Sequence, residues 1–560
     1  MKGSDIRTVE GEDSSVGAKG RDSSIKKGML LALPVIFFVA AFYLLSNISA
    51  PMQRDGAHFV FMANNIAHGL PPYWASFETK NPLVEIFWSL FIFVLAKSQG
   101  ILESVRIAET IWIASTATLI FLTIFCVSLE KKPKGRTLFG SVGLWSGLSV
   151  ALLYLVLALD VRVTDDGLNI ALYQGLPELL LIVLLLRLPS RHHFIHGGAV
   201  GVVIFLSWFV KQTSLLPEFL VIAGCAVVLR GQLRLSWWGG CFLGAVGGVA
   251  AFALHLLVTG TLDNYLLGST IYRSGIAPAL MSEFWSNALA SYSVPIWSLS
   301  FGQFLSVHRI WTTIALVILI PVAMACLYRS RERAWSGARL ALLLSILWMF
   351  GAWLQAVLAL TFFPHYFLSS LAPVALVSGV LISMARRPAA LALSAGVLGL
   401  FFGLIGSYAD MKESNMLRGE LAPINISTAQ VLRFIKPGDR VFNWSGLPHV
   451  LVAYGAPSSY ALNMNWPFIM TGLPDDTKKR MLRNVLRVPP DVVVAMYESY
   501  PKNQGIANYA MNESVLKEVT GLDYVLVYRS STLPGRYGDA VSVFRMKTEL
   551  NGIEGGTSTR

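Results

Sequence analysis

The sequence predicts an α-helical polytopic membrane protein with about 11 to 13 transmembrane helices and a soluble α/β domain at its C-terminal end. Of its 560 residues, 54% are hydrophobic and only 14% are charged, and the mean hydropathy is +0.57. A soluble domain carries roughly 25% charged residues. Near residue 409 the apolar runs give way to charged residues, Asn, Pro and short β-rich stretches. We therefore expect a membrane domain at 28–408 and a soluble domain at 409–560.

Residues 1–27 predict a disordered cytoplasmic tail. They are polar, rich in Gly and Ser, and end in Lys26 and Lys27 directly before the first apolar run. That run lacks a small-residue cleavage site. We expect it to stay in the protein as the first span rather than to be removed as a signal peptide.

Twelve apolar runs follow the tail, and several approach the ~20 residues that a helix needs to cross the hydrocarbon. They lie at about 28–49, 83–97, 104–128, 139–159, 171–188, 197–210, 214–230, 236–258, 309–328, 340–361, 366–384 and 389–408.

Clusters of Lys and Arg between the runs predict which loops face the cytoplasm, because cytoplasmic loops are enriched in these residues. The clusters lie at 26–27, 131–136, 187–191, 230–234, 329–339 and 386–387. They cannot share one face if all twelve runs cross. Either 83–97 or 104–128 must therefore lie in the interface, re-enter or merge with its neighbour, and we expect the shorter run to do so. Eleven crossings then place the N-terminus inside and the C-terminal domain outside.

The same topology gathers the non-basic connecting segments on the outer face. These segments lie at 51–82, 160–170, 211–214, 259–308 and 363–366. They contain most of the polar residues that solvation does not explain, so we expect any chemistry to take place there.

The C-terminal part predicts a small α/β domain of about 150 residues. Short β-rich stretches occur at 440–444, 491–496, 524–528 and 540–545. Helix-like stretches at 428–435 and 475–486 alternate with them.

Charge and cysteine usage argue against nucleic-acid binding and against a disulfide or zinc framework. The formal net charge is +12, but most Lys and Arg stand between apolar runs, which argues against nucleic-acid binding and for a membrane surface. The four cysteines lie in or beside apolar runs and show neither a disulfide framework nor zinc-ligand spacing. A divalent cation stays open as a cofactor, although no ligand spacing in the sequence identifies its site.

The first outer segment carries the most specific pattern of the chain. Asp55 stands in QRDGAHF (53–59) directly after the first span, and Tyr73 ends NNIAHGLPPY (64–73). Lys80 and Pro82 follow in ETKNPL (78–83). This pattern resembles the signature of the polyprenyl-phosphate-dependent glycosyltransferases of the GT-C class, specifically the protein O-mannosyltransferase and lipid A aminoarabinose transferase group of glycosyltransferase family 39. Asn81 stands where that family commonly has a second proline.

The resemblance implies a GT-C fold over 28–408 and an enzyme in the bacterial inner membrane, with its C-terminal domain in the periplasm. It implies a sugar donor linked to a polyprenyl phosphate and an acceptor that is a glycolipid, a polysaccharide or a protein. Asp55 would be the catalytic general base of an inverting transfer, since an acceptor hydroxyl must lose a proton as it attacks the anomeric carbon.

Cations should gather where the charge of the leaving phosphate grows. The outer-face candidates for donor binding are Lys80, Lys211, Arg273 and His365, with Tyr73 and Tyr366 beside them. Other roles stay open, because Lys211 could snorkel to the headgroups, Arg273 could bind lipid phosphates, and His365 with Tyr366 could anchor the interface.

Three acidic residues are candidates for acceptor or metal binding. Asp165 and Asp166 lie together in the second outer segment, where a turn or a helix cap is the simpler explanation. Glu178 stands early in an apolar run, and a structural hydrogen bond explains it equally well.

Two other classes of function compete with the enzyme. A transporter or flippase of lipid-linked sugars would share the many spans and the interfacial cations, but the sequence lacks the paired repeats typical of transporters. A non-catalytic assembly partner would explain the C-terminal domain but not the grouping of Asp55, Tyr73 and Lys80.

Overall fold

The computed structural model describes the helical part and the central parts of the C-terminal domain. The described residues are 14–48, 54–74, 80–129, 142–160, 168–188, 192–229, 233–271, 308–329, 337–358, 364–385, 387–413, 428–444, 448–458, 460, 479, 482–496, 511–529 and 541–547.

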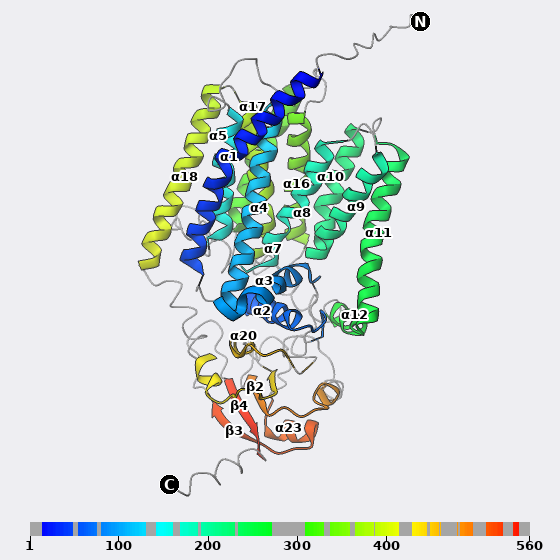
Figure 1. Ribbon diagram of the computed structural model, residues 1–560, viewed down its shortest axis with the longest axis vertical. Coiled ribbons are helices and arrows are strands. Elements are labelled where there is room, and N and C mark those ends of the chain that lie inside the picture. Colours follow the sequence, from blue (N-terminus) through cyan, green and yellow to red (C-terminus); the bar gives the residue numbers. More distant parts are fainter. Residues whose placement is uncertain are drawn as a thin grey trace, which may run out of the picture.

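The apolar runs form helices that lie side by side along the long axis of the molecule (Figure 1). These helices are α1 (Ser14–Asn47), α4 (Ile101–Leu129), α5 (Val142–Leu159), α8 (Gly175–Leu186), α9 (His193–Val210), α10 (Leu215–Val228), α11 (Leu235–Val258), α15 (His308–Arg329), α16 (Gly337–Leu358), α17 (Leu371–Met384) and α18 (Arg387–Glu413). By length and composition, the described residues include seven helices that can cross a membrane and four shorter apolar ones. Large apolar side chains such as Phe38 on α1 and Phe242 on α11 are exposed on the outside of the bundle. The chain is therefore an integral membrane protein.

The run at 83–97 forms α3 (Leu83–Gln99), which is not among these apolar spans. It packs against α2 (Arg54–Ala67) and α4 at the end of the bundle nearest the C-terminal sheet (Figure 1). Glu85 and Trp88 are buried, whereas Phe93 and Val94 are exposed. An apolar outer face and a buried polar face suit a helix in the membrane interface, as expected for the shorter run.

The first helix begins earlier than the sequence suggests. α1 starts at Ser14, so residues 14–27 are helical, although the sequence predicts disorder there. A helix that the apolar residues have already nucleated extends easily through Ala, Lys and Arg, because propagation costs far less than nucleation. Residues 1–13 lie outside the described residues.

The C-terminal domain contains a four-stranded mixed sheet with the order β1-β2-β4-β3. The strands are β1 (Val441–Trp444), β2 (Val492–Met496), β3 (Tyr524–Arg529) and β4 (Val541–Met546). Each lies within a residue or two of its predicted position. β1 and β2 are parallel, and the other two pairs are antiparallel. Short helices accompany the sheet, namely α20 (His449–Tyr454) and α23 (Glu513–Thr520).

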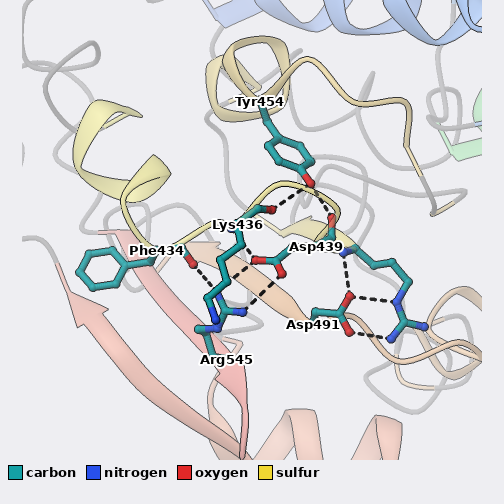
Figure 2. Close-up of polar contacts among 7 residues, drawn as sticks. Phe434, Lys436, Asp439, Tyr454, Asp491 and Arg545 are labelled. Carbon is teal, nitrogen blue, oxygen red and sulfur yellow. Dashed lines mark hydrogen bonds and ion pairs between the residues drawn. The ribbon is translucent and has the colours of Figure 1, made fainter. Parts of the chain in front are cut away.

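Buried and half-buried charges join the segment before β1 to the sheet (Figure 2). Arg545 on β4 donates to the carbonyl of Phe434 at 2.7 Å and to the carboxylate of Asp439 at 3.0 Å. Arg440 pairs with Asp491 at 2.6 Å, and this guanidinium lowers the pKa of the Asp491 carboxyl. Tyr454 donates to the carbonyl of Asp439 at 2.8 Å, which brings α20 into the same network.

Helix α2 lies between the bundle and the C-terminal domain (Figure 1). Asn64 donates to the carbonyl of Gly455 at 3.2 Å, and the Asn65 side chain accepts from the backbone N–H of Ser458 at 2.8 Å. Both asparagines are buried. The C-terminal domain therefore holds one side of α2, and the bundle holds the other.

Helices α9 and α11 touch backbone to backbone. A Cβ on Gly201 would lie 2.0 Å from the carbonyl oxygen of Cys241, and a Cβ on Gly240 would lie 2.1 Å from that of Phe194. Such close approach needs glycine on both helices, as in small-residue packing within membranes. It sets the position of α11, whose C-terminal end reaches the site described next.

Candidate functional site

The predicted residues of the first outer segment lie at the end of the bundle that faces the C-terminal domain. Asp55 is the second residue of α2, in the first turn of the helix. Its side chain lies outside the described residues. An acidic residue in a first turn also stabilises the helix, so the position alone fits both a structural and a catalytic role.

Tyr73 forms a tight turn with a left-handed backbone, at φ +65°. Its hydroxyl donates to the carbonyl of Lys80 at 2.9 Å, and its own carbonyl accepts from Asn264 at 3.0 Å. The buried ring packs edge-on against Tyr265, with a centroid separation of 5.1 Å, and near Phe252 of α11. Tyr73 thus closes the loop that carries Lys80 and ties it to α11 and α12 (Leu262–Ile271).

The two lysines that the sequence predicts for donor binding come together here from distant segments. The Lys80 ammonium lies over the ring of Phe59 on α2, 4.3 Å from its centroid. The Lys211 ammonium lies over the ring of Tyr366, 4.6 Å from its centroid. Tyr366 belongs to the short helix η5 (Pro364–Ser370). Aromatic faces stabilise a cation without neutralising it.

Lys211 occupies the turn between α9 and the short helix η2 (Gln212–Ser214). Burial, together with the positive charge of Lys80, lowers the pKa of Lys211 to about 7, while Glu178 acts in the opposite direction. Because the charge of Lys80 disfavours the charged form of Lys211, a bound anion between the two ammonium groups would be favourable.

Glu178 is buried at the start of α8 and accepts a hydrogen bond from the indole N–H of Trp348 at 2.5 Å. Nearby, Gln174 donates to the hydroxyl of Ser214 and accepts from Gln355 at 3.1 Å. These contacts pack α8 and α16 against the turn that carries Lys211. They fit the structural role that the sequence left open for Glu178.

The remaining candidates are described only in part. Arg273, Asp165 and Asp166 lie outside the described residues, as does the side chain of His365, whose backbone belongs to η5. Within the described ranges, no group of three or more His, Cys, Asp or Glu side chains could hold a metal ion.

Sequence reasoning missed the neutral side chains that hold the lysines in place. Asn81, Gln174 and Gln355 are all fully buried or nearly so in apolar surroundings. Buried amides within apolar runs are costly unless they are hydrogen-bonded. That cost is the signal in the sequence that could have found Gln174 and Gln355.

Comparison with solved structures identifies the fold. No protein-family model and no curated protein matches the sequence. The chain is similar in structure to ArnT from Cupriavidus metallidurans bound to undecaprenyl phosphate, with a TM-score of 0.52 and 12% sequence identity over 92% of this chain and 97% of that one. The chain has a GT-C fold. The apo structure of the same ArnT also matches, with a TM-score of 0.39 and 12% identity over 92% of this chain and 98% of the other.

The alignment covers both parts of this GT-C-fold protein, because 92% of its length cannot be matched by the helical bundle alone. A polytopic helical bundle with a C-terminal soluble domain is therefore the architecture of the whole chain, as the sequence predicts.

Proposed function

We propose that this protein is an integral membrane glycosyltransferase that moves a sugar from a polyprenyl-phosphate-linked donor to an acceptor on the outer face of the bacterial inner membrane. The acceptor classes are a glycolipid, a polysaccharide or a protein. The N-terminus is cytoplasmic and the C-terminal domain periplasmic.

The observation that carries the proposal is the pair Lys80 and Lys211. They come from segments far apart in the sequence, yet the positive charge of Lys80 lowers the pKa of Lys211, and each ammonium lies over an aromatic ring. Both lie at the end of the bundle that adjoins α2, whose first turn contains Asp55. Two cations beside a candidate base suit the binding and transfer chemistry of a lipid-linked phosphate at the membrane surface. The likeness in fold to ArnT, which was solved with undecaprenyl phosphate, supports the same class of donor.

The chemistry is a single displacement. Asp55 takes the proton from the acceptor hydroxyl as its oxygen attacks the anomeric carbon of the sugar. The bond between that carbon and the phosphate oxygen breaks, and the polyprenyl phosphate leaves with the bonding electrons. Lys80 and Lys211 stabilise the negative charge that grows on the leaving phosphate. One displacement inverts the anomeric centre and needs no covalent intermediate.

Replacing the proposed base tests the mechanism. We expect Asp55→Asn to lower sugar transfer by about 10²- to 10⁴-fold, the usual contribution of a general base. Mass spectrometry of cell-envelope glycolipids and polysaccharides measures the transfer in cells that produce wild-type or variant protein. Equal amounts of both proteins in the membrane fraction are the control, and full transfer by Asp55→Asn would refute the assignment.

Replacing a phosphate-binding lysine should weaken donor binding and slow the transfer step, and should leave acceptor binding unchanged. We expect Lys80→Ala to raise the KM for the lipid-linked donor roughly 10- to 100-fold, since a charge-assisted hydrogen bond contributes about 1.5–3 kcal/mol. Initial rates at varied donor concentration in detergent measure this effect. An unchanged donor KM would show that Lys80 does not bind the donor. The KM for the acceptor serves as the internal control.

A further inference from the structure

The loop that carries Lys80 and the turn that carries Lys211 are joined by a single amide. Asn81, the residue after Lys80, is fully buried. Its Nδ2 donates to the carbonyl oxygen of Trp208 at 2.7 Å, and its Oδ1 accepts from Nε2 of Gln212 at 3.2 Å. Trp208 and Gln212 lie on either side of Lys211. Asn81, which follows Lys80, thus bonds to the chain on both sides of Lys211.

The carbonyl of Trp208 requires a hydrogen-bond donor from outside its own helix. Trp208 lies in the last turn of α9, where the backbone N–H of Lys211 bonds to Ser207. The final carbonyls of an α-helix lack partners within the helix and must be satisfied from outside, above all in a membrane protein. Asn81 supplies a donor at that position, so the end of α9 and the Lys80 loop become one unit.

The two lysines repel each other, so other interactions must hold them close together. The charge of Lys80 lowers the pKa of Lys211. Both must nonetheless reach the same small anion. An amide that donates to one flank and accepts from the other resists their separation.

We propose that Asn81 is a positioning residue that fixes the separation of the Lys80 and Lys211 ammonium groups, so that both contact one donor phosphate. This inference depends on the proposed function. It also explains a departure in this chain, since the proline that the resembling family commonly has at this position can neither donate to Trp208 nor accept from Gln212 through its side chain.

Two variants of Asn81 separate its two bonds. Asn81→Leu removes both, and Asn81→Asp keeps the acceptor but loses the donor to Trp208 and adds a charge beside the lysines. We expect each to lower kcat/KM for the donor about 10-fold or more, through a raised donor KM and a lowered kcat, while the acceptor KM stays unchanged. A merely structural role would not separate the donor from the acceptor in this way.

Asn47→Leu is the matched control. Asn47 is also buried, and its Nδ2 donates at 3.2 Å to the carbonyl of Leu159, the last residue of α5. The variant therefore removes the same kind of bond at another helix end. We expect it to lower the thermal stability in detergent as Asn81→Leu does, and to leave the donor KM within about 2-fold of wild type.

The bridge itself is tested without any turnover. Thermal unfolding of Asn81→Leu, Gln212→Ala and the double variant in detergent should be non-additive, because either single change already breaks the bond between the two side chains. Additive losses would show that the bridge is absent and would overturn the inference.

Binding of undecaprenyl phosphate to the purified protein distinguishes a failure of the proposed function from a failure of the positioning role of Asn81. If the wild type neither transfers sugar nor binds this lipid, the proposed function fails and the positioning role fails with it. If the wild type binds the lipid and Asn81→Leu binds it with the same Kd, the positioning role alone is wrong. A Kd raised about 10-fold in Asn81→Leu but not in Asn47→Leu supports both.

Discussion

At the residue scale, the charge of Lys211 depends on what lies beside it. Without a bound anion, burial and Lys80 lower the pKa of Lys211 to about 7. A donor phosphate next to the ammonium would favour its charged form and raise that pKa. Donor binding at a pH above 7 must therefore take up a proton, and the affinity for the donor should fall as pH rises.

This linkage predicts a pH-dependent donor KM. The KM should be flat below about pH 6 and then rise by up to 10-fold per pH unit above pH 7, since one unit of pKa corresponds to about 1.4 kcal/mol. The phosphodiester of a lipid-linked sugar does not titrate in this range. Initial rates between pH 6 and 9 measure the profile.

Lys211→Arg is the matched variant for this profile, because a guanidinium stays charged across the whole range. Its donor KM should vary with pH much less than that of the wild type. The same rise in Lys211→Arg as in the wild type would assign the titration to another group, and a flat wild-type profile would contradict the prediction directly.

The sequence predicts the charged members of the site but not their supports. Lys80 belongs to a recognisable pattern, and a lysine such as Lys211 next to apolar runs must have a partner or a cavity. The partners Phe59 and Tyr366 and the bridge through Asn81 depend on which segments meet in space. A single sequence does not contain that information, because hydrophobic periodicity constrains each helix but not its neighbour.

At the element scale, the contact between α9 and α11 determines where the aromatic cluster around Tyr73 lies. α11 contributes Phe252 and Leu256 to that cluster. The position of α11 in turn depends on the glycine contacts with α9, where no side chain separates the two backbones. A change far from the lysines, in the packing of these two helices, should therefore reach the loop that carries Lys80.

Gly201→Leu tests this dependence. The new side chain would meet the backbone of α11 at Cys241 and must push the helices apart, at a cost of about 1–3 kcal/mol or more. We expect a lower melting temperature in detergent and a raised donor KM. Gly247→Leu on α11 is the control, because a Cβ there meets no atom within 4 Å and should cost less than about 0.5 kcal/mol. Equal losses in both variants would show that the close contact is unimportant.

The sequence predicts secondary-structure elements accurately where an apolar pattern is long or where polar turns mark both of its ends. All four strands were predicted within a residue or two, because each is a short apolar stretch between polar turns. The ends of helices were less accurate. α18 continues to Glu413, beyond the predicted boundary at 408, since the composition changes before the hydrogen-bonded helix ends.

At the scale of the whole molecule, α2 joins the two parts of the protein. It packs against α3 and α4 of the bundle, and its buried asparagines bond to the C-terminal domain at Gly455 and Ser458. The helix that begins with Arg54 and Asp55 is therefore held from both sides. The sequence predicts the two parts but not this contact, which joins residues almost 400 positions apart, because nothing in either segment indicates its partner.

The four cysteines all lie in membrane-domain helices: Cys126 in α4, Cys225 in α10, Cys241 in α11 and Cys326 in α15. Residues 409–560 contain none. A thiol introduced at the exposed Ser514 of α23 would be the only one in that domain, and serine to cysteine changes one atom. We expect Ser514→Cys to react with a membrane-impermeant maleimide on spheroplasts, and labelling only after lysis would place the domain in the cytoplasm.

The distribution of these thiols also matters for how the protein is made. A domain without cysteine can form no disulfide, so its folding does not depend on the thiol redox state of the compartment that receives it or on a disulfide-forming enzyme.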